Sequence, residues 1–228
     1  MYRVEDKYVI SDNRLWILEQ RIALLLPFDK LSNDDGYKIS SLYFDDAVDS
    51  MLSDTLDGNP FRDKYRVRVY NDSFSTIKLE VKRKKYNRVF KISSEITEDE
   101  LQALMLSQTI REGNNFNDAR TLFNLAIKVK GIRPKIIVTY DRKAYVHEAG
   151  NVRITFDRNI RASNQCDLFG KHDIRYDFLM DNGAVLEVKY DEFIPRYIMQ
   201  ALETGNMLQI SNSKYKICRE MYTKGRNK

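Results

Sequence analysis

The sequence predicts an α+β fold of about eight mostly antiparallel strands, with helices packed outside and at the ends. Apolar and polar residues alternate with period two in most of the predicted strands, as in strands with one apolar face. Cations recur on the polar face of one strand after another. We expect the sheet to close into an antiparallel barrel with a cation-lined tunnel, because closure removes exposed edges and separates a lining from an exterior.

Composition is consistent with one globular domain over residues 1–228. The chain has 228 residues, of which 43% are hydrophobic and 31% are charged. It can therefore bury a sizeable core without the charge density of a disordered chain. No internal repeat, low-complexity stretch or linker interrupts it. The net charge of +5 favours anionic partners.

The chain has few of the cysteine and histidine residues that zinc sites, disulfide frameworks and Ser-His-Asp triads require. The chain has two cysteines without a C-x-x-C spacing and two histidines, which argues against a zinc motif, a disulfide framework and a Ser-His-Asp triad. The N-terminus has no signal sequence, and no apolar stretch approaches the ~18 residues of a membrane span. We expect a cytoplasmic protein. Association with the inner face of a membrane through a membrane-protein partner is left open, and the oligomeric state is not predicted.

The clearest pattern is a hairpin between Arg62 and Lys84, which turns at Asn71-Asp72-Ser73. On the first strand, one face is polar: Arg62, Lys64, Arg66, Arg68 and Tyr70. On the second strand, the polar face holds Lys78, Glu80, Lys82 and Lys84. The opposite faces are apolar: Tyr65, Val67 and Val69 on the first strand, and Ile77, Leu79 and Val81 on the second. Such alternation favours strands over helices.

Before this hairpin, the pattern predicts a strand over Tyr2–Ile10 and another over Tyr37–Asp45. Between them, Ser11 or Asp12 is expected to cap a helix that Pro27 ends. Its apolar stripe is Leu15, Leu18, Ile22 and Leu25. A short helix or turn is expected over Asp46–Leu56.

After the hairpin, helices and strands are expected to alternate. Thr97 and Glu100 have the capping-box spacing and predict a helix to about Ser107. A second helix, Phe116–Lys130, is expected to pack through Leu122, Leu125, Ala126 and Val129 and to end at Gly131. Further strands are predicted over 87–96, 134–147, 151–160, 175–180 and 184–190, with a loop over 161–175. Further helices are predicted over 195–207 and 213–223.

The predicted tunnel lining is rich in cations and holds a few carboxylates. It comprises Glu5, Lys7, Arg66, Arg68, Lys78, Glu80, Lys82, Lys91, Arg142, Arg153, Asp157, Glu187 and Lys189. Buried cations are costly without partners, so such a tunnel needs water, counter-charges and an anionic ligand. The natural ligand for so many cations is a chain of phosphates. The alternative for any single strand is that its charged face is exposed to solvent.

These residue types suit phosphoryl chemistry. Arginine binds phosphate oxygens in a bidentate way, and a carboxylate can hold Mg²⁺ or Mn²⁺. No G-x-x-x-x-G-K-[ST] and no G-x-G-x-x-G occurs. We therefore expect side chains, and not a backbone loop, to hold the phosphates.

A series of short motifs then resembles a known family. In chain order they are E-x-K-Y (Glu5–Tyr8), S-L-Y-F-D (Ser41–Asp45), Y-R-V-R-V-Y (Tyr65–Tyr70), L-E-V-K (Leu79–Lys82), Y-D-R-K-A-Y (Tyr140–Tyr145), V-R-I-T-F-D (Val152–Asp157), L-E-V-K-Y (Leu186–Tyr190) and S-K-Y (Ser213–Tyr215). Together they resemble the VTC domain, the polyphosphate polymerase domain of the triphosphate tunnel metalloenzyme superfamily. Each motif is weakly specific alone, but all of them in order are specific.

The resemblance implies a metal-dependent, ATP-dependent polyphosphate polymerase. It would transfer the terminal phosphate of ATP to a growing inorganic polyphosphate in the tunnel. The residues that would bind phosphate or act in catalysis are Arg66, Arg68, Lys82, Arg142 and Arg153, joined by Lys7, Lys91, Lys189 and, from a terminal helix, Lys214. Glu187 would bind the divalent metal, Mn²⁺ or Mg²⁺. The family's polymerases have a second lysine three residues before the S-K-Y lysine, where this chain has Ser211.

Alternatives remain open at this stage. Glu5 is either a second metal ligand or an ion-pair partner of Lys7 or an arginine. Glu187, if it is not the metal ligand, pairs with Lys189 or a neighbouring arginine. Glu80 and Asp157 are expected to balance charge. The same tunnel could hydrolyse tripolyphosphate or a nucleoside triphosphate, or bind polyphosphate without catalysis. Nucleic acid is not expected as a partner, because cations inside a barrel do not form an open stacking platform.

Overall fold

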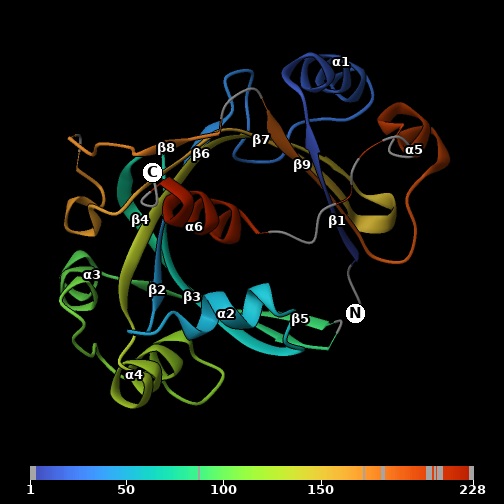
Figure 1. Cartoon of the computed structure of the whole chain (residues 1–228). Coiled ribbons are helices and arrows are strands. Elements are labelled where there is room, and N and C mark those ends of the chain that lie inside the picture. Colours follow the sequence, from blue (N-terminus) through green and yellow to red (C-terminus); the bar gives the residue numbers. More distant parts are fainter. Residues whose placement is uncertain are drawn as a thin grey trace. The chain divides into compact units, whose positions relative to one another are not determined.

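The structure, a computed structural model, describes residues 4–86, 88–171, 173–180, 183–203, 207, 209 and 213–225 (Figure 1). The strands are β1 (Val4–Ile10), β2 (Tyr37–Asp45), β3 (Phe61–Tyr70), β4 (Ser73–Lys85), β5 (Arg88–Ile96), β6 (Arg133–His147), β7 (Val152–Ser163), β8 (Phe178–Leu179) and β9 (Ala184–Tyr190). The α-helices are α1 (Asp12–Ala23), α2 (Ser50–Leu56), α3 (Glu98–Met105), α4 (Ala119–Lys130), α5 (Arg196–Leu202) and α6 (Lys214–Gly225). The predicted α+β class is confirmed. None of the helices in this part of the chain is long and apolar enough to cross a membrane.

The strands are hydrogen-bonded in the order β1-β9-β7-β6-β2-β3-β4-β5, and β8 pairs with β7. The pairs β1–β9, β7–β9, β2–β3, β3–β4 and β4–β5 are antiparallel, as predicted. The order is an open path, and within the described residues no pairing joins its end strands, β1 and β5. The structure therefore does not show the predicted closed barrel. Period-two alternation specifies which face of a strand is buried, but it does not encode whether two distant edge strands pair.

The chain divides into two compact units. Unit 1 comprises Met1–Lys38, Tyr140–Ile160 and Leu179–Ser213. Unit 2 comprises Ile39–Thr139, Arg161–Phe178 and Lys214–Lys228. Strands β2, β6, β7 and β8 each contribute residues to both units. The prediction of a single domain over residues 1–228 stays a prediction.

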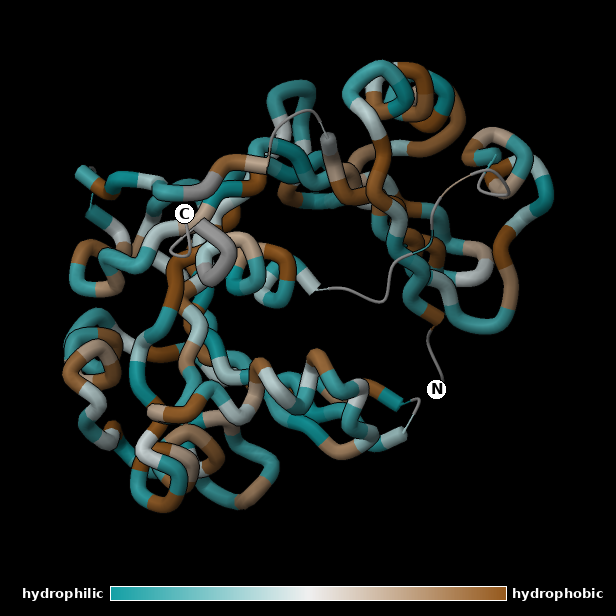
Figure 2. The backbone as a smooth tube through the Cα atoms, in the orientation of Figure 1, coloured by the Kyte–Doolittle hydropathy of each residue, from teal (hydrophilic) through white to brown (hydrophobic). Residues whose placement is uncertain are grey.

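The core of unit 2 lies between α4 and the apolar faces of β3 and β4. Phe123 on α4 is fully buried and makes edge contacts with Phe44 and Tyr65, at ring-centroid distances of 5.3 Å and 5.1 Å. Val67 and Leu79 are buried in the same cluster. Figure 2 shows the backbone coloured by hydropathy, with hydrophobic (brown) and hydrophilic (teal) residues interspersed along the chain. This apolar face fixes the orientation of β3 and β4, so Arg66, Arg68 and Glu80 lie on the opposite face.

The core of unit 1 lies where α1 and α5 pack on β7 and β9. Leu18 and Ile22 of α1, Leu186 of β9 and Ile198 of α5 are buried together. Burial of these side chains holds β9 in place, and β9 carries Glu187 on its other face.

Two predicted helix faces were partly wrong. Leu25 is 43% exposed and Leu26 is buried, because α1 ends at Ala23 and the chain no longer follows the helical period there. In α4, Leu125 and Val129 are exposed. Asp118 caps this helix by accepting a hydrogen bond from the Arg120 N–H, so α4 begins later than predicted.

Other boundaries differ modestly from the predictions. The capping box of Thr97 and Glu100 is present at α3. Strand β7 continues to Ser163, three residues into the predicted loop, past Asn159 at a positive φ of 51°. Helix α5 ends at Leu202, because Glu203 is left-handed with a φ of 45°.

We predict that Phe123→Ala lowers the free energy of unfolding by about 3–5 kcal/mol, because it leaves a cavity among buried aromatic rings. Chemical denaturation at constant pH measures this. The matched control is Phe116→Ala: Phe116 is exposed, so the same substitution should change stability by no more than about 0.5 kcal/mol. Equal losses for both variants would contradict the assigned core.

Candidate functional site

In unit 2, three polar side chains lie side by side across strands β2, β3 and β4. The register places Tyr43 opposite Arg66, and Arg66 opposite Glu80. Directly opposite residues in antiparallel strands share one face of a sheet. The next row places Ser41 opposite Arg68, and the Arg68 Nε lies 3.4 Å from the Ser41 Oγ. The polar face predicted for the hairpin is thus formed, and β2 extends it.

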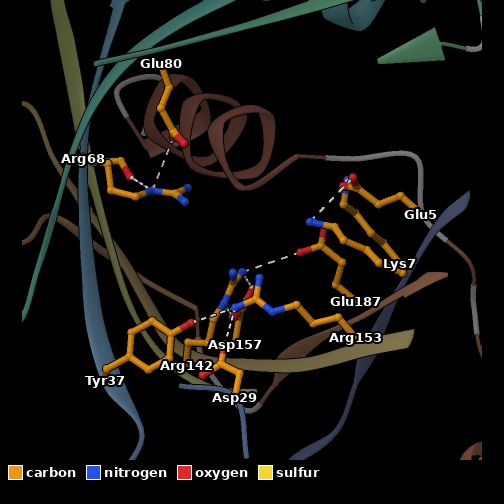
Figure 3. A network of polar contacts seen from close by, with 12 residues as sticks. Glu5, Lys7, Asp29, Tyr37, Arg68, Glu80, Arg142, Arg153, Asp157 and Glu187 are labelled. Carbon is orange, nitrogen blue, oxygen red and sulfur yellow. Dashed lines mark hydrogen bonds and ion pairs between the residues drawn. The ribbon is translucent and has the colours of Figure 1, made fainter. Parts of the chain in front are cut away.

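Glu80 is the centre of this cluster. The Arg66 Nε donates a hydrogen bond to the Glu80 Oε2 at 2.7 Å, and the Arg66 NH2 lies 2.6 Å from the same oxygen. The Arg68 Nε is 3.7 Å from the Oε2, and the Lys91 Nζ is 3.2 Å from the Oε1. Figure 3 shows Arg68 directed toward Glu80. The carboxylate contacts three cations, as expected of a charge-balancing residue.

Burial by itself would raise the pKa of the Glu80 carboxyl. The positive charges of Arg66, Arg68 and Lys91 outweigh that effect and hold the pKa well below its usual range. Glu80 therefore stays ionised at neutral pH although it is buried.

The remaining predicted lysines of unit 2 lie farther along these elements. The register places Lys82 between Lys64 on β3 and Lys91 on β5. Lys78 forms an ion pair with Glu95. Lys214 is the first residue of α6. Ser211 lies outside the described residues.

In unit 1, Arg142 is held by two carboxylates. Its Nε and NH2 donate to the two carboxylate oxygens of Asp157 at 2.5 Å and 2.7 Å. The Arg142 NH2 is also 3.5 Å from the Glu187 Oε2 (Figure 3). All three residues are buried. Burial alone would lower the pKa of Arg142, but Asp157, Tyr140 and Glu187 raise it well above its usual value, so the guanidinium keeps its charge.

Beside this group, Lys189 links two carboxylates on neighbouring strands. Its Nζ is 3.0 Å from the Glu187 Oε1 and 3.7 Å from the Glu5 Oε2. Glu5 also pairs with Lys7 at 2.5 Å. The register explains the grouping, because Glu5 lies opposite Lys189 and Lys7 lies opposite Glu187 on β1 and β9. The predicted pairings of Glu5 with Lys7 and of Glu187 with Lys189 are both present.

Arg153 has two partners that the sequence analysis did not identify. Its NH2 lies 2.5 Å from the Asp29 Oδ2 and donates to the Tyr37 hydroxyl at 3.1 Å (Figure 3). Asp29 lies in the loop after α1, where no periodicity points to it. Tyr37 begins β2, and period-two counting from Ser41 and Tyr43 would have placed it on the same face. Burial raises the pKa of Tyr37, so its hydroxyl remains protonated.

A sequence model of the family described as the VTC domain matches residues 2–222. The chain belongs to the VTC domain family. This confirms the resemblance to the triphosphate tunnel metalloenzyme superfamily that the motifs indicate. A comparison with curated proteins gives no match.

Solved structures share the fold at low sequence identity. A protein from Pyrococcus horikoshii is 17% identical, with a TM-score of 0.52 and coverage of 96% of this chain and 99% of that one. A candidate adenylate cyclase from Bacillus halodurans is 12% identical, with a TM-score of 0.55 and coverage of 93% and 94%. Another from Vibrio parahaemolyticus is 14% identical, with a TM-score of 0.50 and coverage of 95% and 97%. These similarities support the fold.

The family implies a phosphoryl-transfer enzyme that uses a divalent metal. Among the described residues, no group of three or more Asp, Glu, His or Cys side chains is placed to hold a metal. Glu5 and Glu187, however, lie around one ammonium group. Mg²⁺ is usually held by one or two carboxylates together with substrate phosphates. The donor set of Glu5 and Glu187 fits a metal of that kind.

We predict that Glu80→Gln lowers the free energy of unfolding by about 3–5 kcal/mol at pH 7, because it leaves buried cations without their counter-charge. Denaturant unfolding measures the loss. The folded-state pKa of Glu80 is depressed, so its stabilising contribution is present above the unfolded pKa and is lost only as pH falls through the lower, folded value. The difference from the native protein should therefore persist at pH 4 and shrink only in stronger acid.

The control for this prediction is Glu95→Gln. Glu95 also pairs with a lysine, but its side chain is 67% exposed, so the substitution should cost less than about 1 kcal/mol. A Glu80→Gln variant as stable as the control would contradict the central role of Glu80.

Proposed function

We propose that the chain is a polyphosphate polymerase that transfers the terminal phosphate of ATP to a growing inorganic polyphosphate. The observation that carries the proposal is a set of buried or partly buried arginines, each held by a buried or partly buried carboxylate, on the polar face of the sheet in both units. Examples of this arrangement are the pairs that Arg66, Arg142 and Arg153 form with Glu80, Asp157 and Asp29. Membership in the VTC domain family supports it.

The arginines suit phosphate chains because their orientation is set in advance. Asp157 accepts two parallel hydrogen bonds from Arg142, and Asp29 and Tyr37 hold Arg153. A guanidinium fixed in this way loses little freedom when it binds an anion. Lys64, Lys82 and Lys91 lie opposite one another on three strands. Like charges so placed repel, and a bound polyanion would offset that repulsion.

The reaction needs little covalent help from the protein. An oxygen of the terminal phosphate of the acceptor attacks the γ-phosphorus of ATP, the bond from this phosphorus to the β,γ-bridging oxygen breaks, and ADP leaves. The arginines and lysines would position the phosphates and neutralise the charge that develops on their oxygens. A divalent metal held by Glu187 and Glu5 would supply further charge neutralisation at the phosphates.

We predict that Arg66→Ala reduces transfer from ATP by about 100-fold or more, the cost of losing one fixed charge donor. The measurement is incubation with γ-labelled ATP and Mn²⁺, with products resolved on a gel. The native protein should give a ladder of labelled polyphosphate. The matched control is Arg83→Ala, because Arg83 lies on the same hairpin but pairs with Asp63 on the opposite face.

The reaction products also distinguish polymerase activity from hydrolysis and from binding without turnover. Free labelled phosphate without a ladder would indicate hydrolysis, for which water replaces the acceptor in the same site. Tight binding of polyphosphate without turnover would indicate a binding module. Equal activity of Arg66→Ala and Arg83→Ala would contradict the assignment of the cluster around Glu80.

We further predict that Glu187→Gln raises the Mn²⁺ concentration needed for half-maximal binding by at least about tenfold. Electron paramagnetic resonance of Mn²⁺ with tripolyphosphate present measures binding apart from turnover, and a chelator should abolish the activity. The control is Glu192→Gln, an exposed carboxylate two residues beyond β9. An unchanged Mn²⁺ titration for Glu187→Gln would remove Glu187 as a metal ligand.

A further inference from the structure

Tyr43 contacts Arg66 on the side of the guanidinium away from Glu80. The Arg66 NH1 donates a hydrogen bond to the Tyr43 hydroxyl at 3.1 Å, while the Nε and NH2 contact Glu80. Tyr43 and Arg66 are both buried and lie directly opposite each other on β2 and β3. The guanidinium is therefore held through all three of its nitrogens. Because its Nε and NH2 both contact one oxygen of Glu80, the Tyr43 hydroxyl gives the planar group a second point of attachment.

The Tyr43 ring is itself fixed by α6. It stacks on the Tyr215 ring with a centroid distance of 4.9 Å and an interplanar angle of 30°. The Tyr215 hydroxyl donates to the Asp45 Oδ2 at 2.7 Å. Asp45 in turn accepts hydrogen bonds from the Met51 and Leu52 N–H groups at the start of α2.

These contacts form one continuous series. It runs from the first turn of α2 through Asp45 to Tyr215 on α6, then through the ring stack to Tyr43, and ends at Arg66. Tyr215 and Asp45 are almost completely buried. Arg219 gives α6 a second attachment, because its NH2 lies 2.6 Å from the Asp49 Oδ2. The docking of α6 and the orientation of Arg66 are thus built from shared side chains.

We infer that Tyr43 is a positioning residue, which holds the Arg66 guanidinium in its phosphate-binding orientation and links that orientation to the docking of α6 through Tyr215. The inference rests on the proposed function, since it takes Arg66 as a phosphate ligand. Helix α6 also begins with Lys214, so the same docking places two cations of the proposed site.

The experiment measures binding of inorganic tripolyphosphate by calorimetry for the full chain. Tyr43→Phe keeps the ring stack and removes only the hydroxyl that contacts Arg66. A hydrogen bond to a charged group is typically worth enough to change affinity about tenfold or more, so we expect a loss of about tenfold. The loss should disappear in an Arg66→Lys background, because the lysine cannot use the hydroxyl in the same way.

Tyr65→Phe is the matched control. Tyr65 precedes Arg66 on β3, points to the opposite face, and its hydroxyl lies 3.3 Å from Asp63. Removal of that hydroxyl should leave affinity for tripolyphosphate unchanged. Thermal unfolding of both variants checks that they are folded.

A second measurement does not depend on any ligand. The Arg66 Nε–H signal in nitrogen-15 NMR, identified by its loss in Arg66→Lys, should exchange with water faster in Tyr43→Phe and in Tyr215→Leu than in the native protein. Tyr215→Leu removes the ring stack and tests the link to α6. Exchange unchanged in Tyr215→Leu would overturn that link.

The two measurements separate the inference from the proposed function. A native protein that does not bind tripolyphosphate would overturn the proposed function, whereas the Arg66 Nε–H signal would still report on Tyr43. Native-like affinity and native-like exchange in Tyr43→Phe would overturn the inference. An affinity loss of equal size in the Arg66→Lys background would also overturn it.

Discussion

The structure depends on keeping buried cations charged without leaving them unpaired. An arginine transferred from water into a protein interior costs several kcal/mol unless a counter-charge lies within hydrogen-bonding distance. Glu80 meets this need for the buried Arg66 and Arg68, and it also contacts the more exposed Lys91. Three cations converge on this one carboxylate, an arrangement that suits an anionic ligand. The apolar face of β3 and β4 holds these residues in register.

The same solution recurs in unit 1 with different partners. Asp157 binds Arg142 through two parallel hydrogen bonds, and Asp29 binds Arg153. Each carboxylate fixes a guanidinium in one orientation, so the cost of ordering it falls on folding and not on binding. Glu187 and Lys189 complete the group with charges of both signs, an arrangement that suits phosphates accompanied by a divalent metal.

Tyrosine hydroxyls have a recurrent part in this arrangement. Tyr37 contacts Arg153, and Tyr43 contacts Arg66. Both tyrosines belong to β2, which the pattern of charges alone did not mark as part of the site. A hydroxyl can hold a guanidinium without cancelling its charge, whereas a second carboxylate would reduce the attraction for phosphate. This physical difference is consistent with the tyrosines and Ser41 that β2 contributes to the face on which β3 carries Arg66 and Arg68.

The sequence by itself determined the strands and their faces, because period-two alternation follows directly from the geometry of an extended chain. Arg66, Glu80 and Glu187 lie on the faces that the alternation predicts. Tertiary structure decided which charges meet. Asp29 reaches Arg153 from a loop 124 residues away in sequence, and no local pattern records such a contact. Tertiary structure also decided that, among the described residues, no pairing joins the end strands β1 and β5. The sequence could not show this, because the pairing of two edge strands depends on the register of strands that are distant in sequence.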